Sequence, residues 1–526
     1  MKRGIIPLLN IGIRFNRKDF EYDVYSLVRA FYPKSQVQMY YEDEEHTGEY
    51  QLLLLVTYSD QEICLEIEKD NEKIYEKKAF VDYEKDRKET KNVLKHLVYE
   101  ALQTLTGTSL PWGNLTGIRP TKIPMKFLEQ GWKNADIAEY MRNTYSVSRE
   151  KTALAITIAN REKAILKDLD YENGYSLYVG IPFCPSICLY CSFGSHPLER
   201  WVKRVDEYLD ALCKEITFIR QAMGEQKLNT IYIGGGTPTT LEPHQLYRLL
   251  SHIQDTFDFT YVKEYTVEAG RPDSISQEKL KVLRQFPVNR ISVNPQTMNQ
   301  KTLDVIGRKH TVEDTKYIFL TAREMGFSNI NMDLIVGLPG EGKEEVAHTL
   351  EEIEKLHPDS LTVHSLALKR ATRLNLFRDQ YEEMSFENSQ EIMEMTQKCA
   401  QNMGMGPYYL YRQKNIAGNF ENVGYAEVDK AGIYNILIME EKQTILAAGA
   451  GASTKFVSEH GNRIERVENV KDVNQYIQRI DEMLERKRIG IYNWRNQCGY
   501  SGKVCESEAS VAVQSQGTTD SWHAGK

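Results

Sequence analysis

Residues 176–193, SLYVGIPFCPSICLYCSF, determine how the rest of the chain is interpreted. The first six residues have the apolar, β-rich character of a buried strand, and Cys184, Cys188 and Cys191 follow it closely. Iron–sulfur clusters are bound by cysteine thiolates, and three closely spaced thiols on one loop can reach three corners of one small cluster. The spacing therefore predicts a [4Fe–4S] cluster with three protein ligands and one iron left open.

A structural zinc site is the main alternative for these thiols. Zinc normally takes a fourth nearby cysteine or histidine, and His196 could complete such a set. A chance grouping is the remaining alternative. The other cysteines are scattered, which does not suggest a disulfide framework; they are Cys64, Cys213, Cys399, Cys498 and Cys505.

Downstream of this loop, short β-rich runs alternate with amphipathic helices. The predicted strands are 176–181, 229–235, 264–269, 290–295, 330–336 and 360–366. The predicted helices are 198–219, 244–254, 277–286, 301–306, 311–327 and 343–356, and Thr311 with Asp314 forms a capping-box-like start. Six such units imply a parallel sheet of right-handed βαβ units, fewer than the eight of a full barrel. We therefore predict an α/β fold with a partial (βα)6 TIM-like barrel, whose chemistry lies at the carboxyl ends of the strands.

Composition and periodicity divide the chain into five parts. These are an α+β domain at 1–110, a loop and helical linker at 111–170, the partial barrel at 171–384, an α+β extension at 385–490 and a disordered tail at 491–526. Within the extension, residues 408–413, 432–439 and 444–452 are strand-like and 473–488 are helical.

The overall composition is that of a globular protein, with 41% hydrophobic and 27% charged residues. The net charge of −8 argues against a broad nucleic-acid interface, so we expect no nucleic-acid partner. No apolar run reaches the roughly 18 residues that span a membrane. The apolar run near the N-terminus is broken by Asn10 and Arg14, so we expect no signal peptide and a cytoplasmic location.

Several motifs fall where the predicted strands end. In 231–241, IYIGGGTPTTL, Gly235 and Gly236 allow the backbone to approach a ligand closely, although a glycine turn alone is often structural. Glu268 ends the third strand, where a buried carboxylate needs a polar partner such as ribose hydroxyls. An exposed loop glutamate is the alternative.

The later strands end in a similar way. Gln296 follows the fourth strand, and Arg308 lies twelve residues further on in GRKH. Asp333 interrupts an otherwise apolar strand, where a charge is costly without a ligand or partner. Ala367 lies just past the sixth strand, and His364 within it is interpreted as a packed or hydrogen-bonded core residue.

The cysteine loop resembles the signature of the radical S-adenosylmethionine superfamily. Together with GGGTPTTL, NRISVNPQTMN, GRKH and NMDLIVGLPGE, it resembles the oxygen-independent coproporphyrinogen III oxidase group, which includes the heme-chaperone branch HemW. PWGNLTGIRPTK, LTVHSLALKRAT and YYLYRQKNIAGNFENVGYA extend the resemblance to the coproporphyrinogen dehydrogenase branch HemZ over nearly the whole chain. The resemblance implies a [4Fe–4S] cluster and S-adenosyl-L-methionine, two molecules of it, as cofactors.

Family roles can be assigned residue by residue from this resemblance. Tyr178 would contact the cluster-bound S-adenosylmethionine, Tyr190 would stack near its adenine, and Glu268 would hold the same nucleotide. The glycine turn would line the methionine end of the nucleotide. The contacts of a second S-adenosylmethionine would fall on Gly236, Thr237, Gln296, Arg308, Asp333 and Ala367.

The reaction implied is oxygen-independent oxidative decarboxylation of two coproporphyrinogen III propionates to vinyl groups, giving protoporphyrinogen IX in heme biosynthesis. It needs an electron donor such as flavodoxin or ferredoxin. Two departures leave the substrate open, because the oxidase typically has histidine at Gly180 and a fourth cysteine at Phe193. A heme-binding or heme-transfer protein and another heme-directed radical enzyme are the alternatives. Candidate cations for the substrate carboxylates are Arg200, Lys203, Arg204, Lys369, Arg370 and Arg412.

Overall fold

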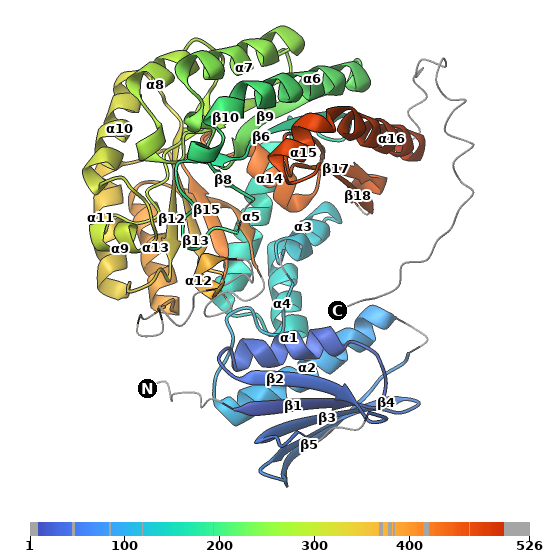
Figure 1. The fold of residues 1–526 in the computed structure, drawn as a ribbon. Coiled ribbons are helices and arrows are strands. Elements are labelled where there is room, and N and C mark those ends of the chain that lie inside the picture. The colour runs from blue at the N-terminus through green and yellow to red at the C-terminus, as the bar shows by residue number, and fades with distance from the viewer. Residues whose placement is uncertain are drawn as a thin grey trace.

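The structure is a computed structural model that contains two sheet-based units joined by three helices (Figure 1). It describes residues 9–44, 48–83, 86–117, 119–192, 194–367, 372–376, 381, 384, 386–413, 420–461 and 463–498. Phe193, Lys369, Arg370 and Cys505, which the sequence analysis considered, lie outside these residues. Within the described ranges, no helix combines the length and the apolar character needed to cross a bilayer.

The N-terminal unit is a five-stranded sheet covered on one face by two helices. Its elements are β1 (Asn10–Phe15), α1 (Glu21–Phe31), β2 (Gln36–Tyr41), β3 (Leu52–Tyr58), β4 (Glu62–Lys69), β5 (Glu72–Phe80) and α2 (Arg87–Thr106). The strand order is β2-β1-β3-β4-β5, with β1 parallel to both of its neighbours. β3 lies in an apolar run that predicts a strand, and its alternate side chains are buried against the helices. The edge strand β2, whose side chains are mostly half-exposed, carries no comparable sequence signal.

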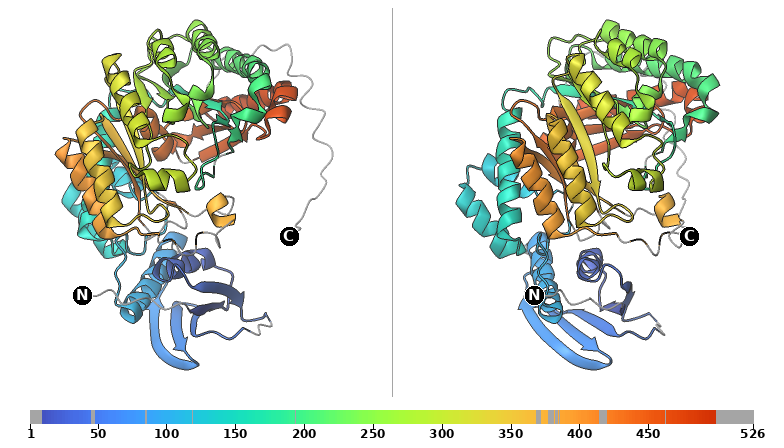
Figure 2. Two further views of the ribbon diagram at one scale, coloured as in Figure 1. Left: turned by 60° about the vertical axis from the view of Figure 1, so that its left-hand side comes forward. Right: turned by 90° about the vertical axis from the view of Figure 1, so that its left-hand side faces the viewer.

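The central unit confirms the predicted parallel (βα)6 arrangement. Its parallel strands are β6 (Gly174–Ile181), β9 (Lys227–Gly235), β10 (Glu264–Glu268), β11 (Arg290–Ser292), β12 (Ile330–Val336) and β13 (Ser360–Ser365). The helices on their outer face are α6 (Val205–Met223), α7 (Pro243–Thr256), α8 (Gln277–Leu283), α10 (Val312–Glu324), α11 (Lys343–Leu356) and α13 (Gln390–Asn402) (Figure 2). The predicted capping box of Thr311 and Asp314 starts α10. Short elements in the connecting loops are β7 (Phe183–Cys184), β8 (His196–Pro197), α9 (Gln300–Val305) and α12 (Arg373–Leu376).

The C-terminal strands join the same sheet, so 385–490 is not a separate layer. These strands are β14 (Gly406–Tyr411), β15 (Asn422–Ala426), β16 (Thr444–Ala448), β17 (Ser453–Ser458) and β18 (Arg463–Glu468). The order is β14-β15-β13-β12-β11-β10-β9-β6-β16-β17-β18. β15 pairs antiparallel with β13, whereas β16 pairs parallel with β6. The extension therefore widens the six-stranded core at both edges.

Residues 432–439, expected to be strand-like, instead form helix α14 (Ile433–Glu440). A short, continuously apolar run does not distinguish a strand from a buried helix, so the tertiary context decides. The buried carboxylate of Glu264 accepts hydrogen bonds from the backbone N–H groups of Ile433 and Tyr434, which caps the start of the helix.

The first eight residues of the tail expected at 491–526 are helical instead. Following α15 (Val473–Gln478), α16 runs from Ile480 to Cys498. Ile491 and Trp494 are buried, and the Trp494 indole donates to the Val457 carbonyl at 2.8 Å. These anchors hold the last two turns of the helix against β17. The rest of the predicted tail lies outside the described residues.

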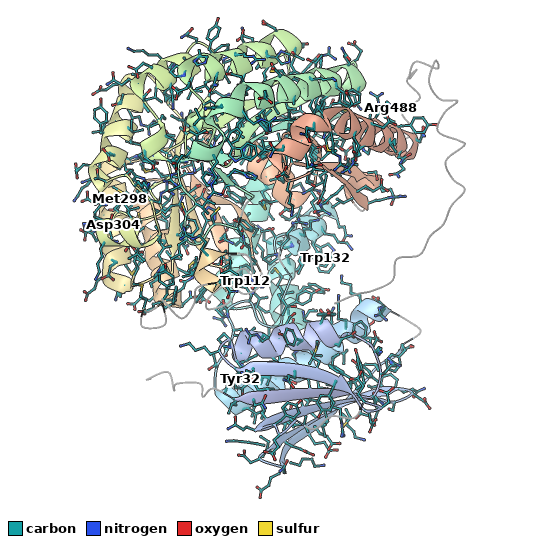
Figure 3. All side chains as sticks on the ribbon, viewed as in Figure 1. Tyr32, Trp112, Trp132, Met298, Asp304 and Arg488 are labelled. Carbon is teal, nitrogen blue, oxygen red and sulfur yellow. The ribbon has the colours of Figure 1, made fainter. Side chains whose placement is uncertain are left out.

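Three helices link the two units: α3 (Lys122–Glu129), α4 (Asn134–Tyr145) and α5 (Arg149–Leu166). Trp112, in the loop before them, lies between the two units (Figure 3). Its fully buried indole donates to Glu421 at 2.7 Å, and Lys151 donates to the other oxygen of the same carboxylate at 2.5 Å. The Arg412 guanidinium donates to the Leu115 carbonyl at 2.6 Å. The loop is thus fixed to the segment that joins β14 and β15.

A buried acid on α5 generates a stability prediction. Both carboxylate oxygens of Glu162 are buried with no hydrogen-bond partner among the described residues. Burial, and then the Glu440 carboxyl group beside it, raise the pKa of Glu162 well above its usual range. Because the folded pKa of Glu162 exceeds the unfolded value, the protonated acid is accommodated without an ionisation cost below about pH 4. As pH rises above this value, the preference of the buried group for its protonated form increasingly lowers the free energy of unfolding. We expect Glu162→Gln to raise the unfolding free energy at pH 8.5 by on the order of 1–3 kcal/mol.

Thermal unfolding at pH 6 and pH 8.5 measures this effect. Glu150→Gln is the matched control on the same helix, because N-terminal backbone N–H groups lower the pKa of Glu150. That control should leave stability unchanged or reduce it slightly. A Glu162→Gln protein that melts below the native protein at pH 8.5 would contradict the interpretation.

Candidate functional site

The carboxyl ends of the parallel strands surround a cavity of about 480 Å³. Cys184, Cys188 and Cys191 all contribute to its lining. The residues predicted to bind S-adenosylmethionine line the same cavity: Tyr178, Tyr190, Gly235, Gly236, Thr237, Glu268, Gln296, Arg308, Asp333 and Ala367. Residues spread over about 190 positions of the chain thus meet at one place, as parallel strands with aligned carboxyl ends require.

Each of the three thiols has a polar neighbour. The Cys184 sulfur lies 3.5 Å from the Thr237 hydroxyl, and the Cys191 sulfur lies 4.0 Å from the Ser195 hydroxyl. The Cys188 sulfur accepts a hydrogen bond from the Arg271 guanidinium at 3.4 Å. All three cysteines are free thiols, Cys184 and Cys188 being buried. The three sulfur atoms do not all lie within 4.8 Å of one another, so the set fits a cluster of several iron atoms better than a single ion.

His196 does not complete a zinc set with these thiols. It lies outside the cavity lining and packs edge-on against the Trp201 ring, with ring centroids 5.5 Å apart. Among the described residues, the potential ligands close enough to share one ion lie elsewhere, on the N-terminal sheet; they are Cys64, Glu66 and Glu76. There Lys73 pairs with Glu66 and Glu76, and Lys78 pairs with Glu62. The structure therefore does not favour the zinc interpretation at Cys184–Cys191.

The glycine turn after β9 packs directly on the start of the cysteine loop. The Gly236 N–H donates to the Ile181 carbonyl at 2.7 Å, and the Thr237 N–H donates to the Phe183 carbonyl at 2.8 Å. Gly235 has φ +108°, and a Cβ on Gly236 would lie 2.6 Å from the Phe183 carbonyl oxygen. The turn needs glycine because of this protein–protein contact as well as its place at the cavity.

Glu268 ends β10 at the cavity wall. The Tyr232 hydroxyl donates to its carboxylate at 2.5 Å. Burial raises the pKa of Glu268 to about 7, with a further increase from Asp333, whereas the bonds from Tyr232 and the Gly235 N–H oppose this shift. The Tyr232 ring stacks on Tyr434, with centroids 4.5 Å apart. Glu268 is therefore a cavity carboxylate with few donors, suited to a ligand that carries hydroxyl groups.

Gln296 and Arg308 reach the cavity from the loops after β11. Gln296 has φ +70°, which is unfavourable for a non-glycine residue, and is held by backbone bonds to Asp333 and Ile335. The Arg308 guanidinium donates to the carbonyls of Gly270 and Asn294 and to the Tyr190 hydroxyl. The buried Nε of Arg308 has no hydrogen-bond partner among the described residues. Arg308 therefore fixes Tyr190 and the neighbouring loops in addition to facing the cavity.

Asp333 on β12 has a partner that the sequence interpretation did not recognise. The Asn331 amide donates to its Oδ1 at 2.7 Å, and the His364 Nε2 lies 3.9 Å from its Oδ2. The other ring nitrogen of His364 lies 3.2 Å from the Tyr411 hydroxyl. His364 thus lines the cavity rather than serving only as a core residue. Burial lowers the pKa of His364, which favours the neutral ring, although Asp333 opposes this shift.

Other lining residues escaped the sequence analysis. They include Arg271, Arg290, Tyr409, Gln413, Asn422 and Tyr434. Tyr434 belongs to the segment interpreted as a strand, and Tyr409 and Tyr411 lie on an added antiparallel strand. For these two tyrosines the spacing of two residues was the available signal, because it places both on one face of a strand.

Of the cations proposed to bind substrate carboxylates, the four that the structure describes do not line the cavity. Arg204 pairs with Glu207 on the outside of the barrel, and Arg412 is buried at the junction between the two units. Arg200 and Lys203 are exposed. Two different lysines, Lys455 and Lys471, line an adjoining cavity of about 430 Å³ together with Gly180. A Cβ on Gly180 would make only ordinary contacts, at 3.4 Å or more.

Known proteins with similar sequences place this fold and site in context. Residues 178–353 match the family model of the Radical SAM superfamily. The chain is 42% identical over 416 residues to the oxygen-independent coproporphyrinogen-III oxidase-like protein HemZ of Bacillus subtilis (strain 168), covering 78% of this chain and 82% of that protein. It is 40% identical over 198 residues to the heme chaperone HemW of the same organism, covering 38% and 52%.

A third relative is the oxygen-independent coproporphyrinogen III oxidase of Escherichia coli (strain K12). The two are 27% identical over 372 residues, which cover 70% of this chain and 79% of the oxidase. The solved structure of coproporphyrinogen III oxidase (HemN) from Escherichia coli aligns with a TM-score of 0.49 at 26% identity, covering 61% of this chain and 73% of that chain.

The fold and the site thus define a radical SAM protein, whose cofactors are a [4Fe–4S] cluster and S-adenosylmethionine. The chain belongs to the family of the oxygen-independent coproporphyrinogen-III oxidase-like protein HemZ. The family expected from the sequence motifs is thereby confirmed.

Glu268 generates a prediction that separates binding from structure. We expect Glu268→Gln to weaken S-adenosylmethionine binding at least tenfold, because hydrogen bonds to a charged group contribute about 1.5–3 kcal/mol. The same change should raise the melting temperature of the ligand-free protein at pH 8. The folded pKa of about 7 lies above the unfolded value, so ionised Glu268 destabilises the fold as pH rises through 7.

Anaerobic calorimetry and thermal unfolding measure the two effects. Glu278→Gln, at the exposed start of α8, is the control and should leave the affinity unchanged. Unchanged affinity together with a lower melting temperature would show that Glu268 is a structural residue.

Proposed function

We propose that Cys184, Cys188 and Cys191 bind the [4Fe–4S] cluster and that the surrounding cavity binds S-adenosylmethionine. The observation that carries this proposal is the convergence of the three thiols and the predicted nucleotide contacts on one cavity. Bound there, the cluster and S-adenosylmethionine supply an electron and a 5′-deoxyadenosyl radical.

We further propose that the substrate is coproporphyrinogen III. At each of two propionates the β-carbon loses a hydrogen atom, the carboxylate carbon leaves as CO2, and one electron passes to an acceptor, so that a vinyl group remains. The names of the HemZ-like and oxidase relatives support this choice. We place the protein in the cytoplasm, where a flavodoxin or ferredoxin would donate the electrons that the cluster needs.

The chain's own residues would position the reactants. The stacked rings of Tyr178, Tyr232 and Tyr434 form an apolar wall beside Glu268 and limit access of water to the reacting region. On the opposite strands, Asp333 and His364 offer hydrogen bonds that fix orientation.

Binding of the propionates needs positive charge. Arg271, Arg290 and Arg308 already donate to protein groups. Lys455 and Lys471 line the adjoining cavity, and we assign the propionates to them. Burial lowers the pKa of Lys455 to about 8, so the Lys455 ammonium group remains mostly protonated at neutral pH. Lys455 itself donates to the Ile438 carbonyl and lies 3.8 Å from the Glu441 carboxylate, which fix its position at the cavity wall.

Heme binding without decarboxylation is the second candidate function. Gly180 favours it, because the missing side chain leaves the adjoining cavity open at the point where the oxidase has histidine. The match to the heme chaperone HemW gives the same indication.

Cluster assembly tests the ligand assignment. We expect Cys188→Ala to lose cluster-bound iron and sulfide and to abolish cleavage of S-adenosylmethionine, because two thiolates do not retain a site-differentiated cluster. Cys213→Ala, on the outer helix α6, is the matched control and should retain both. Full iron content in Cys188→Ala would refute the assignment.

Product analysis tests the reaction. Anaerobically purified, reconstituted protein would be mixed with S-adenosylmethionine, a low-potential reductant, coproporphyrinogen III and an electron acceptor. We expect mass spectrometry to show stepwise loss of CO2 and two hydrogens from the porphyrinogen, together with 5′-deoxyadenosine. Intact porphyrinogen alongside released 5′-deoxyadenosine would exclude this substrate, and stoichiometric heme binding under the same conditions would support the second candidate.

A further inference from the structure

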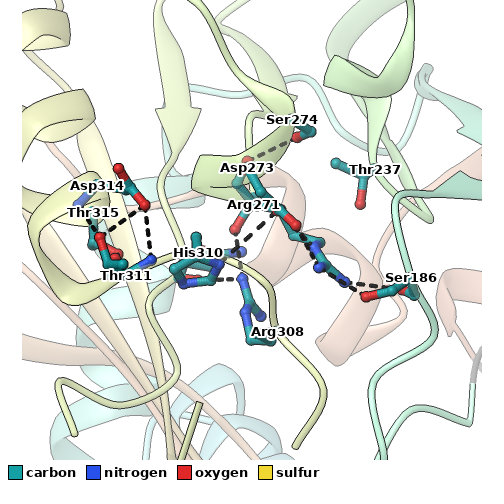
Figure 4. A network of polar contacts seen from close by, with 12 residues as sticks. Ser186, Thr237, Arg271, Asp273, Ser274, Arg308, His310, Thr311, Asp314 and Thr315 are labelled. Atoms are coloured by element: carbon teal, nitrogen blue, oxygen red, sulfur yellow. Dashed lines mark hydrogen bonds and ion pairs between the residues drawn. The ribbon is translucent and has the colours of Figure 1, made fainter. Parts of the chain in front are cut away.

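Arg271, in the loop after β10, binds the cysteine loop through several bonds at once. Its side chain is only 5% exposed. It donates to the Ser186 carbonyl at 2.9 Å and to the Ser186 hydroxyl at 3.0 Å (Figure 4). A further bond runs to the Cys188 sulfur at 3.4 Å. A planar guanidinium is suited to such a fork of donors, and lysine is not.

Asp273 is the acidic partner of this arginine. Its two oxygens accept from Arg271 Nε at 3.0 Å and Nη2 at 2.7 Å, which is a bidentate ion pair. His310 Nδ1 lies 3.9 Å from the same carboxylate, on its far side from Ser186 (Figure 4). Burial and then the neighbouring Arg308 hold the pKa of His310 at about 4, so the ring is neutral. The charge on Arg271 is therefore balanced by Asp273.

The reduction potential of an iron–sulfur cluster depends on net charge and on hydrogen bonds to its sulfur ligands. One-electron reduction of [4Fe–4S]2+ to [4Fe–4S]+ makes the cluster and its thiolates more negative. A cationic donor at a ligand sulfur stabilises the reduced form and raises the potential. A carboxylate behind that donor partly neutralises it and acts in the opposite direction.

We propose that Arg271 is a positioning residue that holds the cysteine loop at Ser186 and raises the reduction potential of the cluster through its bond to the Cys188 sulfur, with Asp273 moderating the effect. The inference rests on the proposed function, because it takes Cys188 as a cluster ligand. It extends that function by assigning control of the electron-accepting step to a pair that belongs neither to the cysteine motif nor to the predicted nucleotide contacts.

A redox titration followed by electron paramagnetic resonance tests the proposal. The proteins compared are the native chain, Arg271→Met, Asp273→Asn and Arg323→Met, each reconstituted and assayed for iron. At a fixed solution potential we expect the reduced-to-oxidised ratio to fall about tenfold in Arg271→Met, equivalent to 59 mV for one electron. Asp273→Asn should shift the ratio in the opposite direction. Arg323 pairs with Asp359 on the outer helix α10, so its loss should leave the potential unchanged.

The opposite signs distinguish tuning from general damage to the loop. Equal potentials in native, Arg271→Met and Asp273→Asn proteins of full iron content would overturn the inference, and so would shifts of the same sign. Should Arg271→Met lose iron, Asp273→Asn must still raise the reduced-to-oxidised ratio, and Arg271→Lys must lower it relative to the native protein. Native protein that binds no cluster would instead refute the proposed function.

Discussion

The site depends on the contact between two loops at the carboxyl edge of the sheet. The cysteine loop after β6 and the glycine turn after β9 are joined by the bonds Gly236 N–H to Ile181 and Thr237 N–H to Phe183. β6 and β9 are adjacent parallel strands, so their ends are already at one level. The glycine turn then brings Thr237 to the Cys184 sulfur. This contact therefore fixes the start of the cysteine loop, where Cys184 lies.

Other elements reinforce the same loop from further round the sheet. Arg271 holds it at Ser186 from the end of β10, and the Leu189 N–H donates to the Ile306 carbonyl at 3.0 Å. Arg308 positions Tyr190 from the loop after β11. The cysteine loop is therefore fixed by three successive strand ends, which is the preorganisation that a cluster and a bound nucleotide require.

The sequence was sufficient to predict the parallel core because each strand is a continuous apolar run bounded by turn residues and followed by an amphipathic helix. It was also sufficient to place the predicted site residues at the ends of these strands, and they line one cavity because strand ends in such a fold are adjacent. It was insufficient for α14, where the buried Glu264 selects a helix from an ambiguous apolar run. It was insufficient as well for His364 and Arg271, because their roles depend on Tyr411, Asp333 and Ser186, which are distant in sequence.

The most direct test of the central claim is pulsed electron–nuclear double resonance on the reduced, reconstituted protein with S-adenosylmethionine labelled with 15N at its amino group. If the cluster bound by Cys184, Cys188 and Cys191 leaves one iron open to the nucleotide, the spectrum will show 15N coupling to the cluster, and this coupling will be lost with unlabelled ligand. A fully reduced cluster with bound S-adenosylmethionine but no 15N coupling would contradict the claim that this cavity joins the two cofactors.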